Sequence, residues 1–340
     1  MVVESMVAWV QHRLGEPEET LGIEHLPTPV PGAGQLLIEV AATGLSFGDL
    51  LFCRGGYQEP TPLPFTPGAE FVGHVVAVGE GTSTPVGQRV IAVSANGCGG
   101  LGQFALAEEQ TTFPAGNSLS DVQAAAFLIA HHTSWTALHR RAHVARGETV
   151  LVHSGAGGIG SASIQIAKAA GAKVIAVAGG AQKTEICAGL GADLVVDHTC
   201  EDFVDVVRTA TVGRGVDIVI DPVNGDIFDR SRRVVAPEGR LVVVGFAGGR
   251  IADLPSNHVL LKNYSVVGVA LPYFHRAAPE YAREMHQKLL ALHEAGALTP
   301  LVQREVPFEE GAHAIAAVPA RETWGRLVVT TGGIDLSNTV

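Results

Sequence analysis

The chain has 340 residues, more than one ordinary hydrophobic core, so we expect two domains. It has 23 basic and 34 acidic residues, a formal net charge of −11, which argues against nucleic acid or an anionic membrane as a partner. No apolar run approaches the roughly 18 residues of a membrane-spanning helix, and the N-terminus lacks the basic segment of a secretory signal. Four cysteines without a C-x-x-C spacing indicate reduced thiols, so we expect a cytoplasmic protein.

Residues 1–129 are predicted to form a compact β domain. Strand-like segments alternate with Pro and Gly, and the prolines at positions 27, 29, 31, 60, 62, 64 and 67 exclude long helices there. We expect strands at Leu36–Val40, Val72–Val78 and, after a turn, within Gly87–Val93.

Residues 130–268 alternate between strand-like and helix-like segments, which predicts βαβ units and a parallel sheet. The expected strands are Thr149–Ser154, Lys173–Ala178, Leu194–Val196, Val216–Ile220, Arg240–Phe246 and Ser265–Ala270. The expected helices are Ile159–Ala170, Gln182–Gly189, Phe203–Thr211 and Ile227–Val235.

Residues 269–340 are predicted to return to the first domain. An amphipathic helix is expected at Pro279–Ala295, ended by Gly296, and strands at Val302–Val306 and Arg326–Thr330. The central domain would then be inserted between two parts of the β domain.

A glycine-rich turn follows the first central strand and opens a helix. Gly155 would allow the tight turn, Gly157 would let a pyrophosphate approach the backbone, and Gly160 would let helix and strand pack closely. The helix N-terminus offers free N–H groups to the anion, although the alternative is merely a close-packed turn. The predicted dinucleotide contacts are Ser154, Gly155, Gly157, Gly158, Ile159 and Gly160.

The end of the second central strand decides between NAD and NADP. NAD-binding domains typically place an acid there, about 20 residues after the glycines. This chain has Gly179, Gly180 and then Lys183, with no acid before Glu185. A lysine suits a 2′-phosphate, so we expect NADPH (NADP+); the alternative for Lys183 is a solvated helix charge. No Lys follows Gly160, which excludes a P-loop.

Nearly the whole chain resembles the zinc-free quinone oxidoreductase branch of the medium-chain dehydrogenase/reductase superfamily, whose pattern also occurs in enoyl-reductase domains. The resemblance rests on five motifs, Gly44–Asp49 with Arg54–Tyr57, Leu63–Glu70, His153–Gly160, Asp221–Gly225 and Leu260–Val269. It implies an α/β fold, in which a GroES-like catalytic domain receives an inserted Rossmann domain with a doubly wound parallel sheet. It also implies NADPH as hydride donor and a homodimer.

By motif position, the resemblance implies further cofactor contacts. Gly179, Lys183 and His198 would hold the 2′-phosphate, with Arg321 closing from the C-terminal segment, although Arg326 competes for that role and His198 could be an ordinary loop residue. Residues after strands facing the nicotinamide would be Gly245, Phe246, Val269 and Leu271, with strand-end packing as the alternative.

The zinc positions of the superfamily are altered in this chain. Ser46 stands at the first ligand position and Ala69 at the second, and a neutral hydroxyl and a methyl group are poor ligands. The four-cysteine lobe of the structural zinc is missing, with only Cys98 in that stretch. His131 and His132 are interpreted as lining or a helix start, so we expect no zinc.

Without a Lewis acid, reduction of an activated acceptor is easier than oxidation of an alcohol. A quinone or an α,β-unsaturated carbonyl accepts hydride at carbon, and the developing oxyanion needs only hydrogen bonds. Candidate donors are Ser46, Tyr57 and Thr133. Their alternatives are ribose binding or a backbone turn for Ser46, loop packing for Tyr57 and a helix cap for Thr133, while Asp49 is expected to anchor its loop.

Three functions remain open. The first is an NADPH-dependent, metal-free reductase of small-molecule quinones or enones. The second keeps the chemistry but takes an enoyl thioester, carried on coenzyme A or a carrier protein. The third is a non-enzymatic, structural or regulatory NADPH-binding protein.

Overall fold

The computed structural model of the chain describes residues 3–58, 61–95, 97–319 and 322–332. The chain divides into two units, of which unit 1 combines residues 1–129, 275–286 and 300–340, and unit 2 combines residues 130–274 and 287–299. The predicted third part, 269–340, differs from this division because residues 269–274 and 287–299 belong to unit 2. One cause is Gln165, whose side-chain amide exchanges hydrogen bonds of 3.0 and 2.8 Å with the backbone of Thr299.

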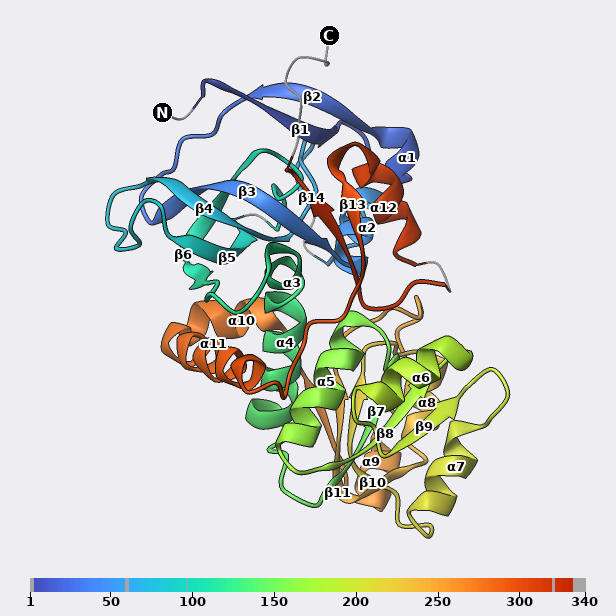
Figure 1. Cartoon of the computed structure of the whole chain (residues 1–340). Coiled ribbons are helices and arrows are strands. Elements are labelled where there is room, and N and C mark those ends of the chain that lie inside the picture. Colours follow the sequence, from blue (N-terminus) through green and yellow to red (C-terminus); the bar gives the residue numbers. More distant parts are fainter. Residues whose placement is uncertain (1–2, 59–60, 96, 320–321, 333–340) are drawn as a thin grey trace. The chain divides into compact units, whose positions relative to one another are not determined.

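Unit 1 contains a six-stranded sheet in the order β13-β14-β3-β4-β5-β6, and an additional β3–β6 pairing curls part of it onto itself (Figure 1). β14 pairs antiparallel with β3, which confirms that the C-terminal strands return to the N-terminal domain. A separate antiparallel pair, β1 and β2, was not expected from the sequence. The strands are β1 (Ser5–Gln11), β2 (Leu21–Pro27), β3 (Gln35–Leu45), β4 (Glu70–Val78), β5 (Arg89–Ser94), β6 (Phe104–Pro114), β13 (Val302–Pro307) and β14 (Arg326–Thr330).

The helices that lie within unit 1 are short, as the prolines required. One of them, α2, is missing from the sequence prediction although its signals are present: Ser46 precedes it, Asp49 is its third residue, and Gly55 ends it with a φ of 68°. The helices are α1 (Pro17–Thr20), α2 (Phe47–Arg54), α3 (Asp121–Ala125), α12 (Gly311–Ala317) and the 3₁₀ turn η2 (Phe308–Glu310). Three further helices contribute residues to both units, α4 (Leu128–Trp135), α10 (Leu271–Ala277) and α11 (Pro279–Glu294).

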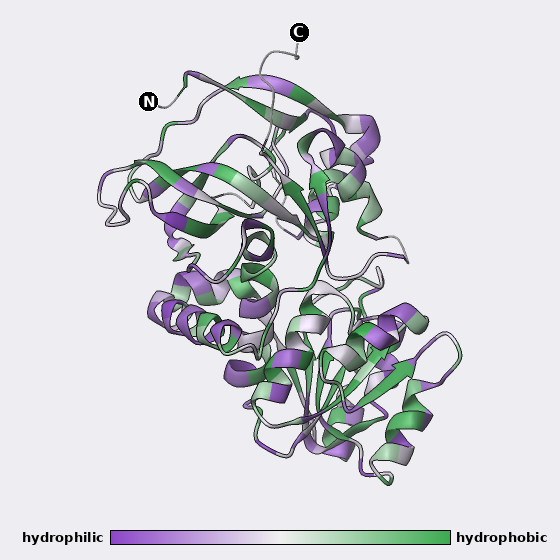
Figure 2. Ribbon diagram, in the orientation of Figure 1, coloured by the Kyte–Doolittle hydropathy of each residue, from purple (hydrophilic) through white to green (hydrophobic). Residues whose placement is uncertain are grey.

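Unit 2 contains a parallel six-stranded sheet in the order β12-β11-β10-β7-β8-β9. Counted along the chain this is the order 6-5-4-1-2-3, the doubly wound arrangement, and it confirms the predicted Rossmann sheet. Figure 2 shows its central strands as largely hydrophobic, as expected for strands covered on both faces. The strands are β7 (Thr149–Val152), β8 (Lys173–Ala178), β9 (Leu194–Asp197), β10 (Val216–Asp221), β11 (Val235–Val243) and β12 (Ser265–Gly268).

Helices connect the strands of unit 2, and Phe203, Val207 and Phe228 from them pack into a core with Leu151, Val219 and Leu241 of the sheet. The helices are α5 (Gly158–Ala169), α6 (Ala181–Gly189), α7 (Phe203–Ala210), α8 (Asp226–Ser231), α9 (Ser256–Lys262) and the π-helix η1 (Thr136–Arg141).

Two predicted boundaries in unit 2 were wrong. The helix expected at Ile227–Val235 ends at Ser231, and β11 already begins at Val235. The strand is irregular there because Glu238 has a left-handed φ of 61°, and its pairing with β10 shifts between Val235 and Arg240. The last strand ends at Gly268, so that Leu271 begins helix α10 rather than following a strand directly.

Candidate functional site

The predicted cofactor residues of unit 2 lie at one edge of the parallel sheet. The carboxyl ends of parallel strands meet at the same edge, and ligands of doubly wound sheets bind where the strand order reverses. In this sheet the reversal falls between β7 and β10. The segments that follow the strands are 154–160 after β7, 179–183 after β8, 198 after β9, 245–246 after β11 and 269 after β12.

The turn between β7 and α5 is tight, but its left-handed residue is Ser154, with a φ of 52°. Gly155 lies in the same turn, but its φ is not positive. A Cβ at Gly155 would lie 2.8 Å from Cys187 Sγ, so its role is close packing against α6. A Cβ at Gly160 would lie 2.0 Å from the carbonyl oxygen of Ser154, which agrees with the predicted close approach of helix and strand.

The first turn of α5 keeps backbone N–H groups that no helical carbonyl can accept, as at any helix N-terminus. Gly157 precedes the helix, and Gly158, Ile159 and Gly160 form its first turn. A Cβ at Gly157 would lie 3.0 Å from Ser154 Oγ, so a side chain would crowd this cradle. The residues present thus fit a bound pyrophosphate.

Buried polar contacts hold the turn between β7 and α5 in place. His153 Nε2 lies 2.8 Å from Ser231 Oγ of α8, and its ring meets Phe203 edge-on at 4.8 Å. Burial lowers the pKa of His153 to about 3, so the ring is neutral and serves packing rather than proton transfer. The Ser134 hydroxyl donates to the carbonyl of Ile159 at 3.0 Å, which ties α4 to the first turn of α5.

The ends of β8 and β9 bring Gly179 and His198 together. A Cβ at Gly179 would lie 2.7 Å from His198 Nε2, so the imidazole occupies the space that any larger residue at 179 would need. Asp197 stabilises this arrangement, because its Oδ1 accepts the Gly180 N–H at 2.9 Å. Hydrogen bonds from Gly180 and Thr199 lower the pKa of Asp197 to about 2.

Lys183 is the third residue of α6, close in sequence to Gly179, and its side chain is half-buried. Burial lowers the pKa of its ammonium group from the ordinary value. The exposed His198 follows β9, and Lys183 lies in the first turn of α6, which follows β8, the strand that pairs with β9.

The other predicted cofactor residues of unit 2 come after strands β11 and β12. Gly245 packs on the loop after β10, where a Cβ would lie 3.1 Å from the carbonyl oxygen of Pro222. Phe246 and Val269 are half-buried and Leu271 is buried, which is also what ordinary strand-end packing produces. Arg321 lies outside the described residues.

In unit 1, the Asp49 carboxylate connects the two altered zinc positions. Its Oδ2 accepts the N–H and the hydroxyl of Ser46, both at 2.7 Å, and its Oδ1 accepts the N–H of Ala69 at 2.9 Å. Asp49 is 1% exposed, and burial raises its pKa while the hydrogen bonds from Ser46 and Ala69 oppose that shift. Asp49 is thus the loop anchor that the sequence predicted.

Ser46 and Tyr57 both lie close to Gly48. A Cβ at Gly48 would be 3.2 Å from Ser46 Oγ and 3.6 Å from Tyr57 Cε2. The Tyr57 ring stacks on Phe52 with centroids 4.0 Å apart and remains 37% exposed. A side chain at position 48 would therefore contact the Ser46 hydroxyl and the Tyr57 ring.

A second buried acid, Glu70, follows Ala69 in the sequence. Its Oε2 lies 3.2 Å from Arg326 Nη2, and its Oε1 accepts the N–H of Ile129 at 3.0 Å. Burial raises the pKa of Glu70 to about 7, and the charge of Arg326 opposes that rise. Arg326 is thus engaged inside unit 1, where its Nη1 also donates to the carbonyl of Leu45 at 2.9 Å.

Thr133 lies inside α4, 6% exposed, so its predicted alternative as a helix cap is wrong. His131 and His132, which were interpreted as lining or a helix start, lie inside the same helix and are 2% and 0% exposed, so they do not begin it. Within the part of the chain that the structure describes, no group of three or more His, Cys, Asp or Glu side chains could hold a metal ion. Ser46 and Ala69 also offer no ligand set for zinc, since one hydroxyl is bonded to Asp49 and the other side chain is a methyl group.

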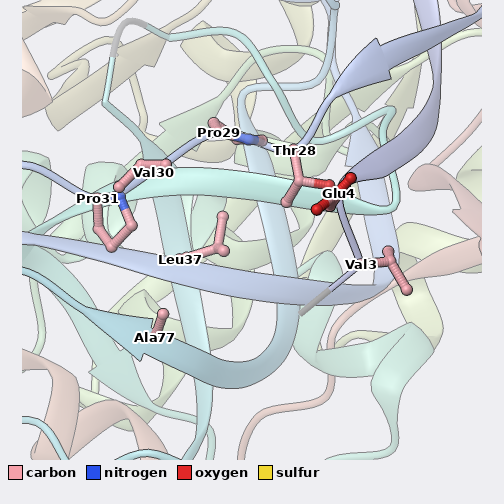
Figure 3. A pocket seen from close by; sticks show the side chains of 8 residues that line it. All are labelled: Val3, Glu4, Thr28, Pro29, Val30, Pro31, Leu37 and Ala77. Atoms are coloured by element: carbon pink, nitrogen blue, oxygen red, sulfur yellow. The ribbon is translucent and has the colours of Figure 1, made fainter. Parts of the chain in front are cut away.

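An open apolar hollow of about 380 Å³ lies elsewhere in unit 1 (Figure 3). It is lined by the N-terminal residues Val3 and Glu4, the loop from Thr28 to Pro31, and Leu37 and Ala77 of the sheet. None of the predicted site residues lines it, so it is not the candidate site.

Comparison with known proteins identifies a matching family for each of two stretches of the chain. Residues 32–120 match the alcohol dehydrogenase GroES-like domain family, and residues 158–289 match the zinc-binding dehydrogenase family. A quinone oxidoreductase-like protein 2 homolog from Nematostella vectensis is 34% identical over 94% of this chain and 87% of its own length. The chain therefore belongs to the medium-chain dehydrogenase/reductase superfamily, among its quinone oxidoreductase-like members, and is an oxidoreductase of that family.

Two further relatives bear on cofactor and substrate. A mycobacterial protein solved in complex with NADPH is 33% identical, with a TM-score of 0.89 over 96% of this chain and all of that one. The phthioceranic/hydroxyphthioceranic acid synthase of Mycobacterium tuberculosis is 36% identical over 88% of this chain, which spans 14% of that much longer protein. Among the described residues, no helix combines the length and apolar character needed to cross a membrane.

Proposed function

We propose that the protein transfers hydride from NADPH to a quinone or an α,β-unsaturated carbonyl without a metal ion. One observation supports the cofactor part: Gly179 and His198 lie against each other after β8 and β9, and the residues that directly follow β8 in the sequence, up to Lys183, include no acid. A cationic side chain and an imidazole there favour a 2′-phosphate over a free ribose hydroxyl. The relative solved with NADPH supports the same choice.

The acceptor part follows from the chemistry of unit 1. Hydroxyl groups suffice for an oxyanion that develops on an already electrophilic acceptor. The candidate donors are those predicted from the sequence, Ser46, Tyr57 and Thr133.

The proposal is tested by following NADPH oxidation with a panel of quinones, enones and enoyl thioesters. We expect turnover with quinones or enones, undiminished by a chelator. The panel also includes saturated ketones: turnover of saturated ketones alone, or activity that a chelator abolishes and zinc restores, would contradict it.

A second candidate substrate is an enoyl thioester, which the similarity to the acid synthase favours. The hydride chemistry is the same, because a thioester carbonyl also activates its conjugated double bond. Faster turnover of an enoyl-CoA than of any quinone in the same panel would select it. Tight NADPH binding without turnover of any acceptor would instead support the non-enzymatic role.

We further propose a cytoplasmic homodimer that pairs through unit 2. β12 is the edge strand of the sheet, and the preceding helix α9 exposes Leu260 and Leu261 by 75% and 77%. An edge strand can pair with its own copy around a two-fold axis, which also buries such leucines. Sedimentation should give twice the monomer mass of 35.4 kDa, and Leu260→Glu with Leu261→Glu should give the monomer.

A further inference from the structure

One carboxylate oxygen connects the loops that follow β8 and β9. Asp197 is the last residue of β9, and its Oδ1 accepts the N–H of Gly180 at 2.9 Å, the N–H of Thr199 at 3.0 Å and the Thr199 hydroxyl at 2.6 Å. These hydrogen bonds, that from Gly180 most of all, lower the pKa of Asp197 to about 2, so the side chain is an ionised acceptor at neutral pH. Three donors occupy the lone pairs of this oxygen, and it is therefore not the acceptor of a ribose hydroxyl.

The hydrogen bond to Thr199 fixes the backbone of the residue between the two partners, His198. An aspartate side chain that accepts the N–H two residues further on closes a turn whose middle residue has a defined conformation. His198 is that middle residue, and its own N–H donates to the carbonyl of Ala178 at 3.0 Å. Because His198 is exposed, its imidazole is held in place and yet accessible to a ligand.

The hydrogen bond to Gly180 fixes the backbone on which the imidazole lies. A Cβ at Gly179 would be 2.7 Å from His198 Nε2 and 3.1 Å from its Cε1, so the ring packs against the bare backbone there. Gly180 follows with a left-handed φ of 83° and directly precedes α6, whose third residue is Lys183. Asp197 thus holds both the backbone under the His198 ring and the start of the helix that carries Lys183.

We propose that Asp197 is a positioning residue for the cofactor preference, which holds His198 and the start of α6 in the places where they contact the 2′-phosphate of NADPH. This inference rests on the proposed function, in which His198 and Lys183 are the phosphate contacts. The opposite role would belong to a carboxylate without such partners, because it would repel the phosphate and favour NADH. The two roles shift the affinity for NADPH in opposite directions when Asp197 is replaced.

The test measures the affinities of NADPH and NADH for the full chain and its variants by calorimetric titration, with no acceptor present. Asp197→Ala should lower the ratio of NADPH to NADH affinity about 3- to 10-fold, the effect of one weakened hydrogen bond to the phosphate. Asp197→Asn keeps an oxygen that can accept the Gly180 N–H, so it should retain the wild-type ratio. An unchanged ratio in Asp197→Ala, an equal fall in both variants, or a higher ratio in either of them would overturn the inference.

Asp193 provides a matched control at the other end of the same strand. It directly precedes β9, its Oδ2 accepts the N–H of Val174 in β8 at 2.7 Å, and it pairs with Lys168 at 2.8 Å. Asp193→Ala should therefore lower the free energy of unfolding, as Asp197→Ala should, but leave the cofactor ratio unchanged. Equal changes of the ratio in the two variants would show a general loss of structure and overturn the inference.

A double-mutant cycle with His198→Ala shows whether Asp197 acts through the imidazole. In the His198→Ala background, Asp197→Ala should lower the ratio by a smaller factor than in the wild-type chain, because the ring that it positions is already gone. Equal factors in the two backgrounds would overturn the inference.

The same titrations and a turnover assay distinguish this inference from the proposed function. The predicted ratios in a protein that reduces no acceptor would contradict the proposed function and leave the role of Asp197 standing. A wild-type preference for NADPH that Asp197→Ala leaves unchanged would contradict the role of Asp197 alone. A wild-type preference for NADH would contradict both.

Discussion

Among individual residues, Gly48 lies beside two candidate site residues, Ser46 and Tyr57. It is the second residue of α2, and a Cβ there would lie 3.2 Å from Ser46 Oγ and 3.6 Å from the Tyr57 ring. Gly48→Ala should therefore raise the KM for the acceptor severalfold, while the added methyl stabilises the helix by up to about 1 kcal/mol. Steady-state kinetics and thermal melting measure the two effects. Gly22→Ala is the control because a Cβ there meets nothing within 4 Å. Unchanged acceptor kinetics in Gly48→Ala would show that the substrate does not bind next to position 48.

Replacing Lys183 tests the prediction that the protein prefers NADPH to NADH. Removing a charge-assisted contact to the 2′-phosphate should weaken NADPH binding about 10- to 100-fold and leave NADH binding unchanged. Calorimetric titration of Lys183→Ala with both cofactors gives the ratio, with the neighbouring exposed Gln182→Ala as the control. If the affinity ratio of NADPH to NADH stays that of the wild-type chain, Lys183 does not contact the phosphate.

At the scale of elements, the β7–α5 turn leaves no room for a side chain at its end. A Cβ at Gly160 would lie 2.0 Å from the Ser154 carbonyl oxygen, whereas a Cβ at Gly189, also helical, meets nothing within 4 Å. Gly160→Ala should lower the free energy of unfolding by at least about 2 kcal/mol and abolish NADPH binding. Gly189→Ala should be neutral or stabilising by up to about 1 kcal/mol. Urea unfolding of both variants measures their free energies of unfolding. Equal values for Gly160→Ala and Gly189→Ala would show that the β7–α5 turn shifts to make room for the methyl group.

Most helices and strands of unit 2 could be predicted from the sequence, but their ends could not. The periodic strands and helices of unit 2 were predictable, since buried parallel strands are continuous apolar runs and the glycines mark one turn. Their ends were not, because Ser154 and Glu238 adopt left-handed backbone that neither residue type favours. The contact of His198 with Gly179 depends on two loops meeting in space, which no local pattern encodes. Helix α2 was predictable from Ser46, Asp49 and Gly55, but the local proline density concealed it.

At the scale of the whole molecule, buried neutral histidines should set the acid limit of stability. Burial lowers the pKa of His275 and His286 to about 4, and His286 Nε2 lies 2.8 Å from the Pro114 carbonyl. Between pH 6.5 and 4 the unfolded chain binds protons that these rings do not, so stability falls as the pH falls, by about 3 kcal/mol for each ring. Glu70, whose pKa is raised to about 7, has the opposite effect between pH 7 and 4.5. There the folded chain binds a proton that the unfolded chain does not, so this group increases stability as the pH falls.

The contribution of one ring can be isolated by comparing slopes. Urea unfolding at pH 7, 6, 5 and 4 should give a smaller loss of stability for His286→Gln than for the wild-type chain. His74→Gln, at an exposed position, should keep the wild-type slope. Identical slopes for all three proteins would show that His286 does not stay neutral in the fold.

We propose that this chain passes a hydride from NADPH to an activated carbon. The most direct measurement uses NADPH deuterated at the transferred position of the nicotinamide, with an enone as acceptor. We predict one deuterium at the β-carbon of the saturated product, together with a primary isotope effect on kcat/KM and no dependence on added zinc. A product without deuterium at that carbon, or NADPH that binds tightly and is oxidised by no acceptor, would contradict the claim.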